Sequence, residues 1–165
     1  MIAALAIVVA TLTPGCLAPP VPGPVTQPFR APTCTYCPGH RGIEFQALPG
    51  TPVRAVVSGT VTFAGTVAGT TYVVLVQPDG LRATYGFLRS AAVRSGALVV
   101  QGQTVGFSTE RVYFGWRQGE TPVDPTPHLG RWRLRARLVP TGGVRGRPNG
   151  TMNGQLQCPT GLSEP

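Results

Sequence analysis

Short apolar runs separated by turn residues dominate the pattern of hydrophobic and polar positions in the middle of this chain. The runs are rich in β-branched and aromatic residues, which favour strands over helices. Within residues 81–87, the apolar Leu81, Ala83 and Tyr85 alternate with polar residues, as in a strand with one solvated face. No window has the periodicity of an amphipathic helix. We therefore predict strands at residues 42–46, 53–57, 59–67, 72–77, 81–87, 104–108 and 112–117.

Glycine and proline content strengthens this prediction. The 165 residues include 22 Gly and 18 Pro, which interrupt the chain too often for long helices and suit short strands joined by turns. Pro78-Asp79-Gly80 is a strong hairpin turn between two of the predicted strands. Because 42% of the residues are hydrophobic, the chain can bury one core. We predict an all-β fold, a compact antiparallel β-sandwich or barrel-like domain.

Changes in composition divide the chain into four predicted segments. Residues 1–16 resemble a secretory signal, because they contain an apolar run that is too short to span a bilayer. Residues 17–33 form an extended Pro-rich arm, residues 34–129 the β-sheet core domain, and residues 130–165 an Arg-rich, irregular C-terminal extension. We expect an exported protein, secreted or associated with the cell envelope, without a transmembrane span.

Four cysteines in an exported chain predict two disulfides, for which three pairings exist. Cys34 and Cys37 are separated by two residues and can close a small loop, which leaves Cys16 to pair with Cys158. Lipidation of Cys16 is the alternative, because this cysteine follows the apolar run, but it would leave an odd number of thiols.

Positive charge is concentrated in arginine. All 14 basic residues are Arg, against six acidic residues, and six of these arginines fall between residues 131 and 147. A net charge of +8 is compatible with a polyanionic partner. No nucleic-acid-binding motif accompanies the arginines, so we expect them on a solvated surface and expect no nucleic-acid partner.

An ordered set of short motifs indicates a family. The set includes His40-Arg41-Gly42-Ile43-Glu44, Pro49-Gly50-Thr51-Pro52-Val53, Thr84-Tyr85-Gly86-Phe87-Leu88, Gln101-Gly102-Gln103-Thr104-Val105-Gly106 and Val112-Tyr113-Phe114-Gly115-Trp116-Arg117. In these motifs and in their spacing, residues 24–129 resemble the lysostaphin-type (LytM) zinc endopeptidases of bacterial cell walls. The resemblance implies a β-sheet core and a role at peptidoglycan.

The resemblance also implies where a zinc site would lie. Family members bind one zinc through a His-x-Gly-x-Asp segment and through the second His of a His-x-His segment. In this chain His40 matches the first ligand, and Glu44 replaces the Asp. Arg111-Val112-Tyr113 aligns with His-x-His, and Phe87 occupies the His position of a Tyr-x-His-Leu segment.

These replacements predict a degenerate site. A guanidinium cannot bind metal or accept a proton, so Arg111 cannot replace a histidine. A tyrosinate is a poor substitute ligand at Tyr113, since a free phenol has a pKa of about 10, and Phe87 has no proton to transfer. His128 is expected to be an ordinary exposed residue beyond the core. We therefore predict no catalytic residue, no bound cofactor and no bound metal. His40 and Glu44 are expected to be vestigial ligand positions.

Three hypotheses for the function follow. The first is a non-enzymatic domain that binds peptidoglycan or regulates a cell-wall hydrolase, with His40, Glu44, Phe87, Arg111 and Tyr113 lining the old substrate groove or filling it. The second is an active zinc-dependent peptidoglycan endopeptidase with a metal site rebuilt on His40 and Glu44, to which Cys34 and Cys37 could contribute only as thiolates. The third is a structural element of the envelope.

Overall fold

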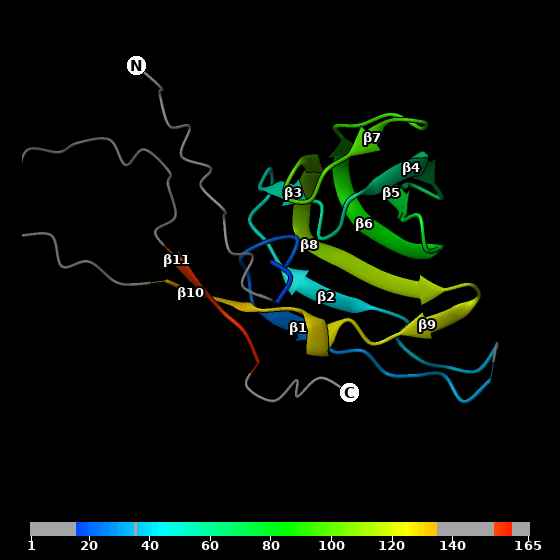
Figure 1. Cartoon of the computed structure of the whole chain (residues 1–165), viewed down its shortest axis with the longest axis horizontal. Coiled ribbons are helices and arrows are strands. Elements are labelled where there is room, and N and C mark those ends of the chain that lie inside the picture. Colours follow the sequence, from blue (N-terminus) through cyan, green and yellow to red (C-terminus); the bar gives the residue numbers. More distant parts are fainter. Residues whose placement is uncertain (1–15, 35, 135–153, 160–165) are drawn as a thin grey trace, which may run out of the picture.

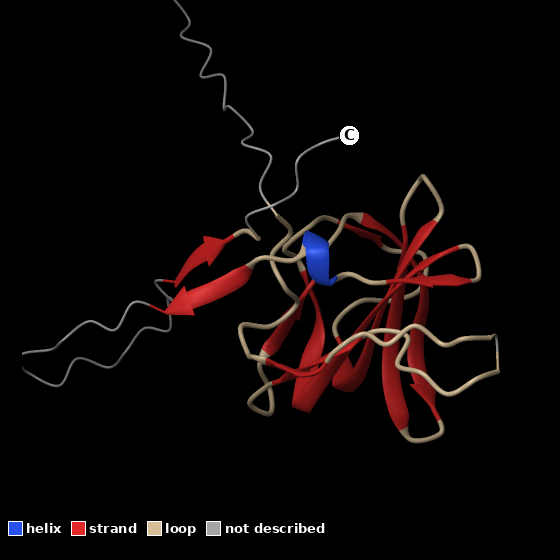
Figure 2. Cartoon of the chain, turned by 90° about the horizontal axis from the view of Figure 1, so that it is seen from below, coloured by secondary structure: helices blue, strands red, loops and turns tan. Residues whose placement is uncertain are grey.

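The structure is a computed structural model that describes residues 16–34, 36–134 and 154–159. Strands dominate this part of the chain, and its one helix is the 3-10 helix η1 (Thr126–His128), the blue turn in Figure 2. The prediction of an all-β antiparallel fold is confirmed. Within the described residues, no helix is long and apolar enough to cross a membrane.

Nine strands form one antiparallel sheet in the order β1-β2-β8-β6-β5-β4-β7, with β3 and β9 also paired to β8 (Figure 1). A ribbon of two further strands extends from the sheet (Figure 2). The sheet strands are β1 (Val25–Gln27), β2 (Ile43–Gln46), β3 (Pro52–Arg54), β4 (Gly59–Val67), β5 (Thr70–Val76), β6 (Leu81–Ala91), β7 (Leu98–Val99), β8 (Thr104–Gln118) and β9 (Thr121–Val123), and the ribbon strands are β10 (Arg131–Leu134) and β11 (Gly154–Gln157).

The alternation of side chains along β8 gives the sheet two different faces. Phe114 is fully buried and lies opposite Ile43 of β2 and Tyr85 of β6, so these three residues belong to the core face. The preceding residue, Tyr113, lies opposite Glu44 of β2. Because neighbouring residues of a strand point to opposite faces, Tyr113 and Glu44 share the face away from the core.

Tyr85 anchors the core of the sheet. Its side chain is fully buried, and its hydroxyl oxygen accepts a hydrogen bond of 2.8 Å from the backbone N–H of Val56. Burial raises the pKa of Tyr85 far above the ordinary value for a phenol, because the charged form would lose its hydration. The phenol therefore stays neutral and supplies the acceptor that the buried N–H of Val56 needs.

Two strands predicted at residues 104–108 and 112–117 are one continuous strand, β8, so the predicted break between them is wrong. Relative to β6, β8 contains extra residues between Ser108 and Tyr113, which form a bulge of β8. Gly86 of β6 lies opposite Tyr113 and Leu88 lies opposite Ser108, so Phe87 alone spans four residues of β8. Phe87 has a φ of 56°, a left-handed conformation that non-glycine residues rarely adopt.

The Pro-rich arm packs against the domain. It contains β1, and Val21 is 1% exposed within the core. The C-terminal extension, which was expected to be irregular, contains the pair β10 and β11, in which Trp132 lies opposite Leu156. The sequence signal for β10 is the alternation of Arg131, Trp132, Arg133 and Leu134, which has a period of two.

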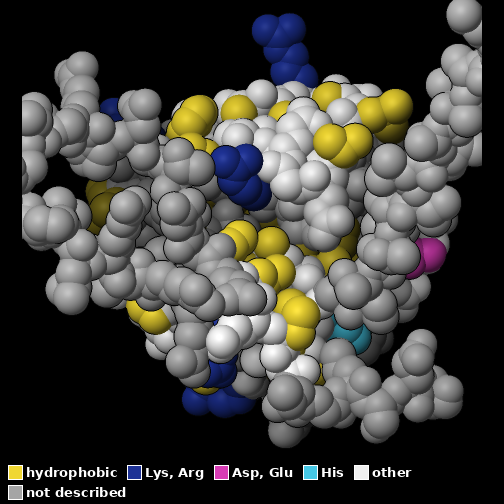
Figure 3. Space-filling view, turned by 60° about the vertical axis from the view of Figure 1, so that its left-hand side comes forward, with side chains coloured by type: hydrophobic (Ala, Val, Ile, Leu, Met, Phe, Trp, Pro, Cys, Tyr) yellow, Lys and Arg dark blue, Asp and Glu magenta, His cyan; other side chains and the backbone are white. Residues whose placement is uncertain are grey.

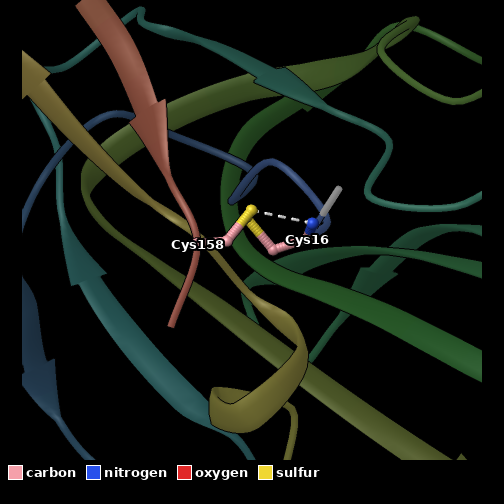
Figure 4. The surroundings of a disulfide bond; sticks show 2 residues. All are labelled: Cys16 and Cys158. Atoms are coloured by element: carbon pink, nitrogen blue, oxygen red, sulfur yellow. Dashed lines mark hydrogen bonds between the residues drawn. A yellow bond between two sulfur atoms is a disulfide. The ribbon is translucent and has the colours of Figure 1, made fainter. Parts of the chain in front are cut away.

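Both predicted disulfides are present, Cys34 with Cys37 and Cys16 with Cys158. In Figure 4 the second bond joins the start of the described chain to the segment after β11, and the backbone N–H of Cys16 donates to the Cys158 sulfur. Since this bond uses the Cys16 sulfur, it is incompatible with the lipidation considered above. The signal-like run before Cys16 and the arginines from Arg135 to Arg147 lie outside the described residues.

A few large hydrophobic side chains remain on the surface. Over the face drawn in Figure 3, hydrophobic side chains gather in separate clusters. Among the described residues the most exposed are Tyr36 at 96%, Leu98 at 82% and Leu48 at 79%. All three lie in loops or in the two-residue edge strand β7.

Candidate functional site

The five residues predicted to form the degenerate site lie together on the face of the sheet opposite the core. His40 lies three residues before the start of β2 and Glu44 lies within it, whereas Arg111 and Tyr113 come from β8 and Phe87 from β6, opposite the bulge of β8. The cluster forms because β2 and β6 both pair with β8 at Tyr113, which lies opposite Glu44 of β2 and Gly86 of β6. Sequence motifs separated by about 70 residues therefore meet at one place.

The carboxylate of Glu44 is the centre of this cluster. Its side chain is 9% exposed, which is unusual for a charged residue. One oxygen, Oε1, lies 3.3 Å from Nε2 of His40, and the other, Oε2, lies 3.5 Å from Nη1 of Arg111. Each carboxylate oxygen thus has its own nitrogen partner, and Arg111 supplies the positive charge that a buried carboxylate requires.

His40 is held on both sides of its ring. Nδ1 lies 3.0 Å from the carbonyl oxygen of Pro28, and Nε2 faces Glu44. A backbone carbonyl can only accept a hydrogen bond, so Nδ1 carries the proton in this arrangement. Only the imidazolium form donates to the carbonyl and to the carboxylate at the same time. In the neutral form, the lone pair of Nε2 points at the carboxylate.

Arg111 stacks on an aromatic ring. The central carbon of its guanidinium lies 3.9 Å from the centroid of Phe87, a cation–π geometry. The hydroxyl of Thr109 holds the underlying bulge, because it donates to the carbonyl oxygen of Phe87 at 2.8 Å. Thr109 Oγ1 also lies 3.5 Å from the backbone nitrogen of Arg111. One hydroxyl therefore connects the ring and the residue that stacks on it.

The Tyr113 side chain packs against two glycines, at which any larger residue would clash with it. A Cβ atom on Gly42 would lie 2.7 Å from the Tyr113 ring, and one on Gly115 would lie 2.6 Å from its hydroxyl oxygen. The ring meets His40 and Phe87 edge-on, with centroids 5.9 and 6.4 Å apart. Burial raises the pKa of Tyr113, although the nearby Arg117 opposes the effect. At neutral pH Tyr113 therefore carries a phenol and not a tyrosinate.

The donor set does not fit a zinc ion. His40 and Glu44 provide two candidate ligands, whereas a zinc site takes three or four. Tyr113, which the sequence resemblance aligns with a histidine of the family, carries a neutral phenol, and the Arg111 cation contacts the remaining carboxylate oxygen of Glu44. Among the residues that the structure describes, no group of three or more His, Cys, Asp or Glu side chains could hold a metal.

The other residues considered as ligands do not join the cluster. His128 is exposed in η1 and packs edge-on against Trp116, with ring centroids 5.4 Å apart. Trp116 lies opposite Ala83 in the core and so points away from the face that carries Tyr113. Cys34 and Cys37 are joined to each other, and the described chain contains no free thiol that could bind a metal.

A hollow next to the cluster was missed by the sequence analysis. It has a volume of about 410 Å³ and is lined by Pro49, Arg89, Thr109, Glu110 and Arg111. Arg89 and Thr109 were not recognised because neither belongs to a family motif. The available signal for Thr109 was its position two residues before Arg111, where a hydroxyl can hydrogen-bond the local backbone.

Comparison with known proteins places these features in a family. The model of Peptidase family M23 matches residues 38–125, which include all five residues of the cluster. The catalytic domain of the antimicrobial peptidase lysostaphin from Staphylococcus simulans superimposes with a TM-score of 0.55 and 26% identity, covering 64% of this chain and 90% of that domain.

Two relatives share only part of their length with this chain. An uncharacterized protein of Mycobacterium tuberculosis is 45% identical over 64 residues, which are 39% of this chain and 26% of that protein. The murein hydrolase activator EnvC of Escherichia coli is 33% identical over 99 residues, which are 55% of this chain and 24% of EnvC. The chain thus spans about a quarter of the length of these relatives.

Proposed function

The chain belongs to peptidase family M23, and from this membership we propose that it is a non-catalytic member that binds peptidoglycan outside the cytoplasm. The observation that carries the proposal is the ion pair between Arg111 and Glu44. It puts a fixed positive charge on the carboxylate that corresponds to a metal ligand in the family. A dication and a guanidinium compete for the same oxygen, and the guanidinium is part of the chain.

The chemistry of peptide hydrolysis supports the same conclusion. A metallopeptidase needs a metal that polarises the scissile carbonyl and activates a water. It also needs a group that accepts and returns a proton. At the positions of the supporting histidines this chain has Arg111 and Phe87, and neither can exchange a proton at neutral pH. Tyr113 keeps its proton because burial raises its pKa.

The surface chemistry of the cluster suits a wall fragment. Arg111 is 52% exposed, so its guanidinium is accessible while it pairs with Glu44. Arginine binds carboxylates, and aromatic rings pack against sugar faces. Two disulfides are consistent with an oxidising compartment, where peptidoglycan is found.

Regulation of a cell-wall hydrolase is the second candidate. The observation that favours it is the 33% identity with the murein hydrolase activator EnvC. The shared region is 24% of EnvC, so the activator role of the whole protein transfers to this chain only as a proposal.

Co-sedimentation with insoluble peptidoglycan tests the proposal. The full oxidised chain is incubated with purified sacculi, and bound protein and released soluble fragments are measured with added zinc and with a chelator. We expect binding without release, no effect of zinc, and no sedimentation with insoluble cellulose as the control polymer.

Two other results would replace this proposal. Zinc-dependent release of fragments that disappears in His40→Ala identifies an active endopeptidase with a rebuilt site on His40 and Glu44. Absence of binding, together with faster digestion when a partner hydrolase is added, identifies the regulatory function.

A further inference from the structure

We propose that Arg111 and Arg89 form a binding site for the free carboxylate of a peptide, located in the hollow beside the Glu44 cluster. The inference rests on the proposed function, since it names the chemical group of the wall peptide that the domain recognises. Its elements are the stacked guanidinium of Arg111, the hollow that Arg111 shares with Arg89, and the bulge that fixes both the ring and the strand.

The orientation of the Arg111 guanidinium is the first observation that supports the site. The central carbon of this guanidinium lies over the Phe87 ring, 3.9 Å from the ring centroid. The contact with Glu44 uses Nη1 at 3.5 Å, and no hydrogen bond to the other guanidinium nitrogens is found within the described part of the chain. A planar guanidinium fixed on an aromatic ring presents its edge to a ligand, and that edge matches the two oxygens of a carboxylate.

The backbone conformation of Phe87 is the second observation that supports the site. Phe87 adopts a φ of 56°, a strained conformation of the kind that is concentrated at functional sites. The Thr109 hydroxyl secures this conformation through its 2.8 Å bond to the Phe87 carbonyl. Phe87 and Thr109 act as positioning residues for Arg111, because Phe87 has no polar side-chain group and the Thr109 hydroxyl donates its proton to the Phe87 carbonyl.

The charged residues that line the hollow are the third observation that supports the site. Arg89 is exposed, and no ion pair of Arg89 is present among the described residues. Arg111 adds a second positive charge, and Glu110 adds one negative charge. With the Glu44 carboxylate 3.5 Å from Arg111 counted as well, the two positive and two negative charges cancel, so Glu44 and Glu110 repel a singly charged carboxylate less than a doubly charged phosphate. Glu110 can also accept a hydrogen bond from an amide N–H next to the bound carboxylate.

A matched pair of ligands tests the site. N-acetyl-alanyl-alanine with a free C-terminal carboxylate is compared with its C-terminal amide, in L and D forms, by NMR titration of the full oxidised chain. We expect the acid to bind at least about tenfold more tightly than the amide, since a hydrogen bond to a charged group contributes about 1.5–3 kcal/mol. Equal binding of acid and amide overturns the proposal.

Variants locate the binding. Arg111→Gln and Arg89→Gln should each weaken acid binding about tenfold, while Arg94→Gln, an exposed arginine outside the hollow, should leave it unchanged. Arg111→Lys keeps the charge beside Glu44 but loses the planar fork, so it should fold normally and still bind the acid more weakly. Full binding by Arg111→Lys, or equal binding of inorganic phosphate, overturns the carboxylate assignment.

The outcome is separable from that of the proposed function. If sacculi still bind to Arg111→Gln and the acid and amide bind alike, the carboxylate site is wrong and peptidoglycan binding stands. If the acid binds at the hollow but sacculi do not sediment the protein, the site stands and the proposed function is wrong.

Discussion

Arg111 and Glu44 form an ion pair across neighbouring strands, with 3.5 Å between Nη1 of the arginine and Oε2 of the glutamate. The glutamate side chain is 9% exposed and the arginine side chain 52%. The pair therefore stands between a surface salt bridge, which contributes little, and a buried one, whose disruption is costly. Breaking the pair is costly mainly because the Glu44 charge is shielded from water.

Removal of Arg111 alone should destabilise the fold more than removal of both charges. Arg111→Gln leaves the Glu44 carboxylate buried beside His40 only, and we expect a loss of about 1–2 kcal/mol in the free energy of unfolding. The double variant Glu44→Gln/Arg111→Gln should be more stable than the sum of the single changes predicts. Urea unfolding measures the cycle, with Arg94→Gln as the control. Strict additivity would show that the two side chains do not interact.

The family resemblance grouped the five cluster residues in the sequence, and in the structure their motifs lie on or next to the paired strands β2, β6 and β8. His40 and Glu44 are adjacent through their spacing in the chain, and Tyr113 lies directly opposite Glu44. The arrangement of Arg111 could not be predicted in the same way. It depends on the bulge at Phe87, where one residue spans four of the neighbouring strand, and no local sequence pattern encodes that count.

The strand predictions failed where tertiary pairing overrides local preference. We predicted separate strands at residues 104–108 and 112–117, but the backbone continues through Glu110 and Arg111 because β2 pairs with β8 there. The Glu110 carbonyl accepts a 2.9 Å hydrogen bond from Ala47, so its main chain is satisfied while its side chain remains exposed. The Pro-rich arm likewise contributes Val21 to the core, although its composition indicates only an extended chain.

The two disulfides should differ in their effect on stability. The Cys16–Cys158 bond closes a loop with a sequence separation of 142, and the Cys34–Cys37 bond one of 3. By loop-closure entropy, Cys16→Ser/Cys158→Ser should cost about 5 kcal/mol and Cys34→Ser/Cys37→Ser about 2 kcal/mol.

Unfolding of the oxidised variants in urea measures the difference, and full reduction of the wild type serves as the control. Equal losses in the two double variants would mean that the long loop is already restrained by other contacts in the unfolded chain.

Tyr85→Phe should be destabilising at neutral pH and less so in alkali. At pH 7 the variant leaves the buried Val56 N–H without its acceptor, and we expect a loss of about 1–3 kcal/mol. The pKa of Tyr85 is raised well above about 10, its value in the unfolded chain, so the folded protein keeps a proton that the unfolded one releases. Wild-type stability should therefore fall as the pH rises above about 10.

Unfolding free energies of wild type and Tyr85→Phe between pH 7 and pH 11 check this sign. The gap between the two proteins should narrow as the pH rises, because the variant lacks the titrating phenol. Tyr36→Phe is the matched control, since its side chain is 96% exposed. A constant gap over the whole range would contradict the raised pKa.

Restoring the family ligands should create a zinc site. The triple change Glu44→Asp, Arg111→His and Tyr113→His removes the competing cation and places two imidazoles on the strand that faces His40. Each added ligand contributes to a tetrahedral site, so we expect zinc affinity to rise by at least about a hundredfold over wild type. Competition against a chromophoric chelator measures the affinity of the purified, oxidised protein.

The matched control is Glu44→Gln/Arg111→Gln/Tyr113→Phe, which removes the same three side chains without adding a donor. It should fold and bind no more zinc than wild type, and adding His40→Ala to the restored variant should abolish the gain. A restored variant that folds and still binds no more zinc than wild type would mean that residues 44, 111 and 113 do not occupy the family's ligand positions. In that case the ion pair of Arg111 with Glu44 belongs to an unrelated surface, and these residues are not the remains of a catalytic centre.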